Sequence, residues 1–188
     1  MVNWDFPIEK MFMGYNRHNY NGAFPENVET VIKNLVRSPC LHLFSGTSKM
    51  GDVRVDIERK EATINMDVFE FIKTKEAQKQ WKWCILDPPY LIYNPEQDLK
   101  DYGNKTAVSA SIPKRNAFAK FFMSYCENVL WLDHCAPRPK GFIRGKVWFF
   151  FPGGYIHIRV LSWLKREQSL INFINKKENG SPPMFENI

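Results

Sequence analysis

The sequence predicts an α/β protein with one mostly parallel sheet that ends in an antiparallel hairpin. Short apolar runs rich in β-branched residues alternate with amphipathic helical stretches, which is the pattern of a layered α/β sheet with helices on both faces. Near the end of the chain, two apolar runs flank Pro152-Gly153-Gly154, and this spacing predicts two antiparallel strands joined by a tight turn. The 188 residues, 44% of them hydrophobic, are enough for a single domain with one core.

The first regular element is expected to be a helix that starts at Pro25. Apolar residues recur after it at helical spacing, and Glu26 is favourable at the positive end of a helix dipole. This helix is expected to end near Ser38-Pro39. The preceding residues 1–22 show little periodicity, so we expect an extended N-terminal arm or loop there.

The remaining elements are expected in the order of a layered sheet. A helical stretch containing Phe69 and Ala77 precedes the fourth strand, and a second helix from Arg115 to Asn128 precedes the fifth. Residues 23–166 are expected to form the domain, and residues 167–188 a polar tail. The expected strands are Leu41–Phe44, Val53–Ile57, Ala62–Met66, Trp83–Leu86 and Val129–Leu132, with hairpin strands Val147–Phe151 and Tyr155–Trp163.

The overall charge favours a partner that carries phosphates. The formal net charge is +6, although an ordinary solvated surface can also have such a balance. No run of residues is long and apolar enough to span a membrane, and no signal-peptide pattern is present, so we expect a cytoplasmic protein without a membrane partner. The four cysteines are widely spaced and form no CxxC pair, so no metal site is expected.

Asp87-Pro88-Pro89-Tyr90 carries the clearest chemical signal, because a buried strand delivers it to the edge where open α/β sheets bind ligands. The exocyclic amine of a base is a poor nucleophile, since its lone pair is delocalised into the ring. Acceptors for its two N–H bonds favour the pyramidal, nucleophilic form, and the Asp87 carboxylate and the Pro88 carbonyl can be these acceptors. The prolines fix the backbone, and Tyr90 can stack on a flat substrate. The alternative is a proline-rich turn that only leaves the strand.

The same four residues resemble the catalytic motif of the amino-methyltransferases, which use S-adenosylmethionine to modify adenine N6 or cytosine N4. Leu41 to Gly46 resembles the first-strand motif of class I S-adenosylmethionine-dependent methyltransferases, in which small residues let the backbone approach the cofactor. The resemblance implies a Rossmann-like sheet and S-adenosylmethionine as cofactor. The residues that it implies near the methionine part of the cofactor are Phe24 and Pro25 of a Phe-Pro-Glu element, together with Phe44, Ser45 and Gly46. A simple helix start is the alternative for Phe24-Pro25.

The adenosine part of the cofactor is expected to meet two acids. In the resemblance, Asp56 hydrogen-bonds the ribose and Ile57 lies against the adenine, while Asp67, with Val68, accepts from the adenine amino group. Asp56 follows Gly46 by only ten residues, whereas the ribose acid of a nucleotide-binding βαβ unit follows by about 20. Either the first crossover is shortened, as the alternating Val53 to Ile57 pattern favours, or Asp67 holds the ribose.

The candidate substrate-binding residues lie in and around a polar segment that follows the motif. Its interleaved tyrosines and lysines suit a nucleic-acid groove, in which bases stack and phosphates are contacted, and a second basic loop contains Arg138, Lys140 and Arg144. Two solvated connectors are the alternative. The candidates are Tyr90, Tyr93, Lys114 and Arg115.

The expected function is methylation of an exocyclic amino group of a DNA or RNA base, with adenine N6 favoured. DNA enzymes of this kind usually carry a separate target-recognition domain, for which 188 residues leave no room. This points to RNA, to low sequence specificity, or to a partner subunit that recognises the target. The alternatives are a methyltransferase of a protein side-chain amide or a small-molecule amine, and a non-catalytic methyltransferase-like subunit of a complex.

Overall fold

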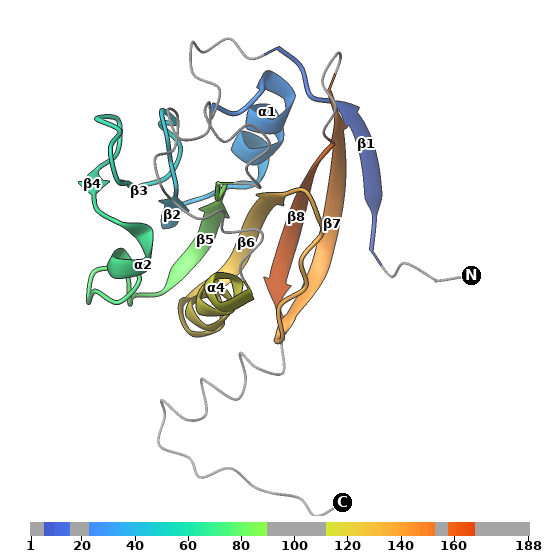
Figure 1. Cartoon of the computed structure of the whole chain (residues 1–188). Coiled ribbons are helices and arrows are strands. Elements are labelled where there is room, and N and C mark those ends of the chain that lie inside the picture. Colours follow the sequence, from blue (N-terminus) through green and yellow to red (C-terminus); the bar gives the residue numbers. More distant parts are fainter. Residues whose placement is uncertain (1–5, 16–22, 90–111, 153–157, 168–188) are drawn as a thin grey trace, which may run out of the picture.

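The computed structural model describes residues 6–15, 23–89, 112–152 and 158–167. They form an α/β structure around an eight-stranded sheet with the strand order β1-β7-β8-β6-β5-β2-β3-β4 (Figure 1). The elements along the chain are β1 (Ile8–Phe12), α1 (Glu26–Leu35), β2 (Cys40–Leu43), β3 (Val53–Asp56), β4 (Ile64–Asn65), α2 (Val68–Phe71), β5 (Trp81–Leu86), α4 (Ile112–Tyr125), β6 (Cys126–Asp133), β7 (Phe142–Phe151) and β8 (Arg159–Arg166).

The strands are parallel except for one. β8 runs antiparallel to both of its neighbours, β6 and β7, and every other pair in the sheet is parallel. From β2 the chain moves outward to β3 and β4, and it then returns to the other side of β2 to add β5 and β6. The direction of strand addition therefore reverses between β2 and β5.

The core lies in two layers, one on each face of the sheet. Alternate residues of a strand point to opposite faces, so Leu41 and Leu43 of β2 belong to one layer and Cys40 to the other. Helices α2 and α4 cover the first layer, and α1 covers the second. The first layer includes Leu41, Leu43, Val55, Phe71, Leu86, Phe118, Phe122 and Trp131, and the second includes Val28, Ile32, Cys40, Trp83, Ile85 and Leu130.

Most of the predicted elements are confirmed, with shifted ends. The first helix begins one residue after Pro25, which is its N-cap. The strand before the hairpin begins at Cys126, where the sequence predicted a helix as far as Asn128. Backbone pairing of Cys126 and Asn128 with Trp81 and Trp83 overrides the local helical pattern there. The hairpin is antiparallel as predicted, although its turn lies outside the described residues, as does the predicted tail from residue 168 onward.

The main difference from the predicted fold lies in the N-terminal arm. Ile8–Phe12 is not a loop but the edge strand β1, parallel to β7. Its partner is more than a hundred residues away in sequence, so local periodicity gives little sign of the pairing. Glu9 secures the strand to β7, because its carboxylate forms an ion pair with Lys146 and accepts a hydrogen bond from Trp148 Nε1 at 3.1 Å.

The predicted shortening of the first crossover is confirmed. Residues 44–52 between β2 and β3 contain no helix, although parallel strands are usually joined through one. The chain turns back at Gly51, which has φ of +94° and where a Cβ would lie 3.1 Å from His42 Cβ. The Asp52 carboxylate then accepts from Cys40 N at 2.7 Å. Residues 57–63, between β3 and β4, also contain no helix.

The described chain has no helix with the length and apolarity needed to cross a membrane.

Candidate active site

The candidate site lies at the carboxyl ends of β5, β2 and β3. Leu43 pairs with Leu86 on one side and with Val55 on the other, so the residues that follow these three emerge side by side at one edge of the sheet. Those residues are Phe44, Asp87 and Asp56. The edge coincides with the reversal of strand order between β2 and β5, which is where open α/β sheets bind ligands.

The turn after β2 has an unusual backbone. Phe44 and Gly46 have φ angles of +57° and +54°, in the left-handed region that costs a non-glycine residue about 1 kcal/mol or more. The aromatic rings of Phe69 and Phe118, whose centroids lie 6.4 and 5.8 Å from that of Phe44, help to hold it. Ser45 N donates to Val55 O at 3.0 Å. The turn is thereby fixed against β3, with Ser45 and Gly46 buried.

Asp56 joins the two halves of the predicted cofactor site. Its Oδ2 accepts from Gly46 N at 3.0 Å, and its Oδ1 accepts from Glu58 N at 3.0 Å and Arg59 N at 3.1 Å. A carboxylate has about four acceptor positions, so Oδ2 keeps capacity for one further donor such as a hydroxyl. The backbone contacts also fix the orientation of the carboxylate before any ligand binds.

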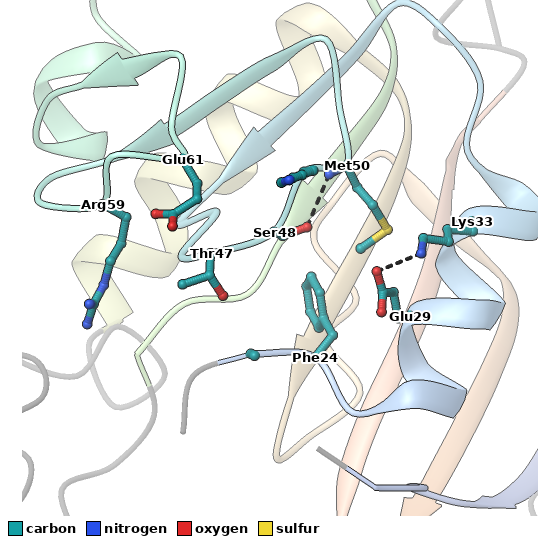
Figure 2. A pocket seen from close by; sticks show the side chains of 10 residues that line it. Phe24, Glu29, Lys33, Thr47, Ser48, Met50, Arg59 and Glu61 are labelled. Atoms are coloured by element: carbon teal, nitrogen blue, oxygen red, sulfur yellow. Dashed lines mark hydrogen bonds and ion pairs between the residues drawn. The ribbon is translucent and has the colours of Figure 1, made fainter. Parts of the chain in front are cut away.

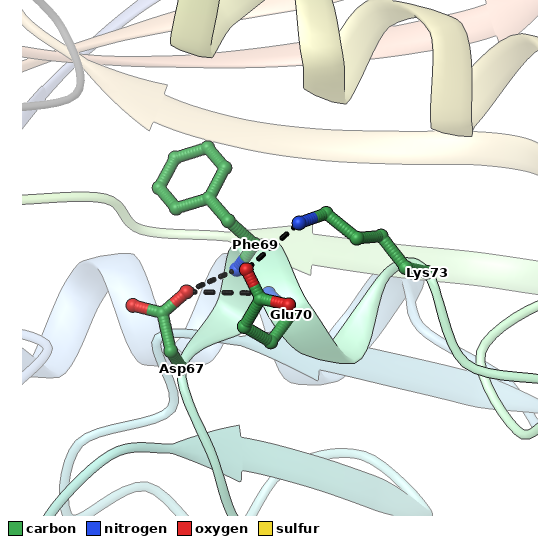
Figure 3. A network of polar contacts seen from close by, with 4 residues as sticks. All are labelled: Asp67, Phe69, Glu70 and Lys73. Atoms are coloured by element: carbon green, nitrogen blue, oxygen red, sulfur yellow. Dashed lines mark hydrogen bonds and ion pairs between the residues drawn. The ribbon is translucent and has the colours of Figure 1, made fainter.

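Asp67 is the N-cap of α2. Its Oδ1 accepts from Phe69 N at 2.8 Å and from Glu70 N at 3.2 Å, and Figure 3 shows its other oxygen pointing away from the helix. A capping role was not part of the sequence prediction. It leaves one oxygen of Asp67 for the predicted contact with an adenine amino group.

Replacing Asp67 with alanine is expected to lower the free energy of unfolding by about 1 kcal/mol, because two backbone donors of α2 lose their acceptor. Urea unfolding followed by circular dichroism measures the change. Asparagine retains the capping oxygen, so Asp67→Asn should unfold within a few tenths of a kcal/mol of the wild type. Equal losses in both variants would contradict the capping role.

Two exposed apolar side chains lie beside these acids. Ile57 follows Asp56 and is 42% exposed, and Met66 follows the paired residue Asn65 and is 38% exposed. A flat apolar ring can cover both. By contrast, the Val68 side chain is buried in the core layer with α2 and does not reach the edge.

The catalytic candidates emerge from β5. Asp87 is half-buried, Pro88 is buried and Pro89 is half-buried. Asp87 therefore stands at the boundary between core and solvent, next to Phe44. Tyr90 and Tyr93, which were predicted to contact the substrate, lie outside the described residues.

Phe24 and Pro25 lie at the start of α1, on the other side of the β2 turn. Both are buried, and the Phe24 ring stacks on His42 with a centroid distance of 5.6 Å. Burial lowers the pKa of His42 to about 4, while its Nδ1 lies 3.1 Å from Met50 O. His42 is therefore neutral near pH 7 and places no charge beside Phe24.

A pocket of about 730 Å³ opens beside Phe24 (Figure 2). It lies between α1, the β2–β3 connection and the β3–β4 connection, where neither connection contains a helix to fill the space. Apart from Phe24, none of the residues that line it was predicted from the sequence. Two of them, Glu29 and Lys33, lie on the face of the first helix that turns away from the core, and the helical pattern of the sequence could have placed them there. The lining residues are Ala23, Phe24, Glu29, Lys33, Thr47, Ser48, Lys49, Met50, Arg59 and Glu61.

Lys114 and Arg115 lie in the first turn of α4, which covers the opposite face of the sheet from α1. Lys114 Nζ lies 5.4 Å from the Phe69 ring centroid, and the Arg115 guanidinium lies 5.6 Å from that of Trp131. Arg115 also donates to Cys135 Sγ at 3.3 Å and faces Asp133, which is only 1% exposed, at 4.0 Å. Arg115 thus has structural contacts that the sequence did not predict.

Polar and apolar groups of the edge match parts of S-adenosylmethionine, the cofactor that the resemblance implies. Ser45 Oγ is buried and finds no hydrogen-bond partner among the described residues, so a ligand atom could satisfy it. Asp56 Oδ2 and one oxygen of Asp67 have capacity for donors, and Ile57 and Met66, each next to one of these acids in the sequence, expose apolar surface. These features fit the hydroxyls and the adenine of the cofactor. Within the described residues, no group of three or more potential metal ligands occurs.

Comparison with known proteins does not assign the chain to a family. No protein-family model matches it, and no curated protein matches its sequence. The functional inference therefore depends on the chemistry of the sheet edge.

Proposed function

We propose that the chain is an S-adenosylmethionine-dependent methyltransferase that acts on an exocyclic amino group of a nucleic-acid base, with adenine N6 favoured. The main support for the proposal is that Asp87-Pro88 and the Phe44–Gly46 turn follow neighbouring parallel strands, β5 and β2, at the point where the strand order reverses. The resemblance assigns an acceptor role to the first segment and a cofactor role to the second. Because β2 and β5 are adjacent, the two segments can contact a cofactor and a substrate that are bound next to each other.

The strand order supports a Rossmann-like class I sheet as part of the proposal. The sequence β4-β3-β2-β5-β6 is the order of the first five strands of a doubly wound nucleotide-binding sheet. The final strand, β8, is antiparallel to its neighbours, as in the terminal strand pair of the class I methyltransferases that the sequence resembles.

The residues of the edge would hold the cofactor by its polar ends. Ser45 and the backbone at Gly46 would face its methionine part, and Asp56 Oδ2 would accept from a ribose hydroxyl. Asp67 and Ile57 would contact the adenine. When bound, S-adenosylmethionine supplies a methyl group activated by a sulfonium.

Asp87 and Pro88 would orient the amine that receives the methyl group. The Asp87 carboxylate and the Pro88 carbonyl accept its two N–H bonds, which draws the nitrogen out of conjugation with its ring. The two prolines keep the acceptors in place without adding competing backbone donors. The amine must lose one of its two protons once it carries the methyl group, and Asp87, which accepts that N–H bond, can pass the proton to solvent, so no histidine base is needed.

A nucleic acid is the substrate that the charge distribution favours. Lys114 and Arg115 lie at the same edge, and Arg138 and Lys140 lie in the connection between β6 and β7. Arg144, predicted in the same basic loop, lies instead within β7, where it pairs with Leu164 of β8. The net charge of +6 favours association with phosphates. We also infer a cytoplasmic location and a partner subunit that recognises the target.

Calorimetric titration of the full chain with S-adenosylmethionine tests the proposal. The wild type is expected to bind, and Asp56→Asn to bind at least about tenfold more weakly, since hydrogen bonds to a charged group contribute about 1.5–3 kcal/mol. Asp52→Asn is the matched control, because Asp52 also accepts from backbone and side-chain donors, at Cys40 and Ser38, but lies at the opposite end of the strands. Absence of binding by the wild type would contradict the proposal.

A further inference from the structure

The pocket beside Phe24 has charges of both signs on its walls. Glu29 and Lys33 lie one turn apart on α1 and form an ion pair at 2.7 Å. Lys49 stands on the β2–β3 connection, and Glu61 on the β3–β4 connection. Figure 2 shows the Glu29–Lys33 pair next to Met50, on the side of the pocket away from Arg59. The pocket thus offers an acid and bases close together, beside apolar surface.

The pocket adjoins the proposed cofactor site. Phe24 forms part of its wall, and Thr47 and Ser48 directly follow Gly46, whose amide is bonded to Asp56. A ligand bound along the β2 turn would extend one end into this space. The side chains at that end decide which chemical group fits.

The Glu29–Lys33 pair on the pocket wall fits a ligand group that has a positive and a negative charge close together. An α-amino-acid moiety is such a group, because its ammonium and carboxylate are attached to the same carbon. Charge-assisted hydrogen bonds to both would replace the internal ion pair without leaving either side chain unpaired. Phe24 and Met50 supply apolar contact for the methylene groups that follow.

We infer that Glu29 and Lys33 bind the α-ammonium and the α-carboxylate of the cofactor, with Lys49 adding positive charge beside the carboxylate. This inference rests on the proposed function. It extends that function to two residues that lie outside every motif in the resemblance.

The alternative is an ordinary surface ion pair, and the chain offers a direct comparison. Glu70 of α2 and Lys73, which lies just after that helix, also pair at 2.7 Å, but their side chains are 63% and 66% exposed and line no part of the pocket. Glu29 is only 28% exposed, with Lys33 at 59%, so the acid of the first pair is held against the protein. An exposed pair of this kind contributes little to stability.

The test compares two ligands on the full chain by calorimetry. S-adenosylmethionine contains the amino-acid moiety, and 5′-methylthioadenosine lacks it. Glu29→Gln and Lys33→Met are each expected to weaken S-adenosylmethionine binding about tenfold and to change 5′-methylthioadenosine binding less than twofold. Glu70→Gln and Lys73→Met should leave both affinities unchanged.

Three results would overturn the inference. In the first, S-adenosylmethionine affinity is unchanged in both α1 variants. In the second, the two ligands lose affinity equally, which indicates general damage to the pocket. Either result leaves the proposed function intact, because the wild type still binds the cofactor. In the third, the wild type fails to bind S-adenosylmethionine, which overturns the inference together with the proposed function.

Discussion

Replacing Asp87 with alanine is expected to slow methyl transfer by about a hundredfold or more, while the affinity for S-adenosylmethionine stays within a fewfold of the wild type. Alanine removes the carboxylate that accepts an N–H bond of the amine, whereas asparagine would keep an acceptor oxygen at the same position. Removing one preorganised electrostatic contact to a reacting group typically costs two to three orders of magnitude in rate.

Single-turnover measurements with enzyme in excess over a labelled oligonucleotide give this rate without interference from product release. The cofactor affinity of the same preparation, measured by calorimetry, shows whether the site is still assembled. Asp52→Asn serves again as the control, since it alters a carboxylate at the far end of the strands. A variant that transfers methyl groups at the wild-type rate would remove Asp87 from the mechanism.

The second large effect is expected in the pH dependence of stability. Burial lowers the pKa of His42 from 6.5 to about 4. Above pH 6.5 the imidazole is neutral in both the folded and the unfolded chain, so its contribution to stability is fully present. Between pH 6.5 and 4 the unfolded chain takes up a proton that the folded chain does not, and the free energy of unfolding falls by roughly 3 kcal/mol.

Urea unfolding at a series of pH values measures this loss. Carboxylates also titrate near the lower end of the range, so the informative quantity is the difference from His42→Gln, which has no titrating ring. The variant is expected to be less stable than the wild type at pH 7.5 and to lose less stability on acidification. Parallel pH profiles for the two proteins would show that His42 is not buried in its neutral form.

The sheet could be predicted because its strands carry their own pattern. Val53 and Val55 alternate with polar residues, and the short spacing to Gly46 correctly indicated a crossover without a helix. The ends of the elements were less predictable. α4 ends at Tyr125 because Cys126 pairs with Trp81 and its carbonyl accepts from Arg166 Nε at 2.9 Å. Neither contact is visible in the local sequence.

The part of the candidate site that could be predicted is the part in which a sequence motif lies at the end of a strand. Gly46 and Asp56 were assigned to one ligand from their positions, and a hydrogen bond joins them. The pocket was not predictable, because its walls come from three separate segments, α1 and the connections on either side of β3, whose relative positions the local sequence does not show. Glu29 and Lys33 carry no motif, and only the orientation of α1 directs them into that space. The capping bonds of Asp67 likewise depend on where α2 begins.

The most direct test of the central claim is transfer of a radiolabelled methyl group from S-adenosylmethionine to separate pools of DNA, RNA and protein, followed by digestion and identification of the labelled product. The proposed function predicts label in nucleic acid, recovered as N6-methyladenine, and loss of that label with Asp87→Ala. Label recovered only in protein, or no transfer to any pool by a chain that binds the cofactor, would contradict it.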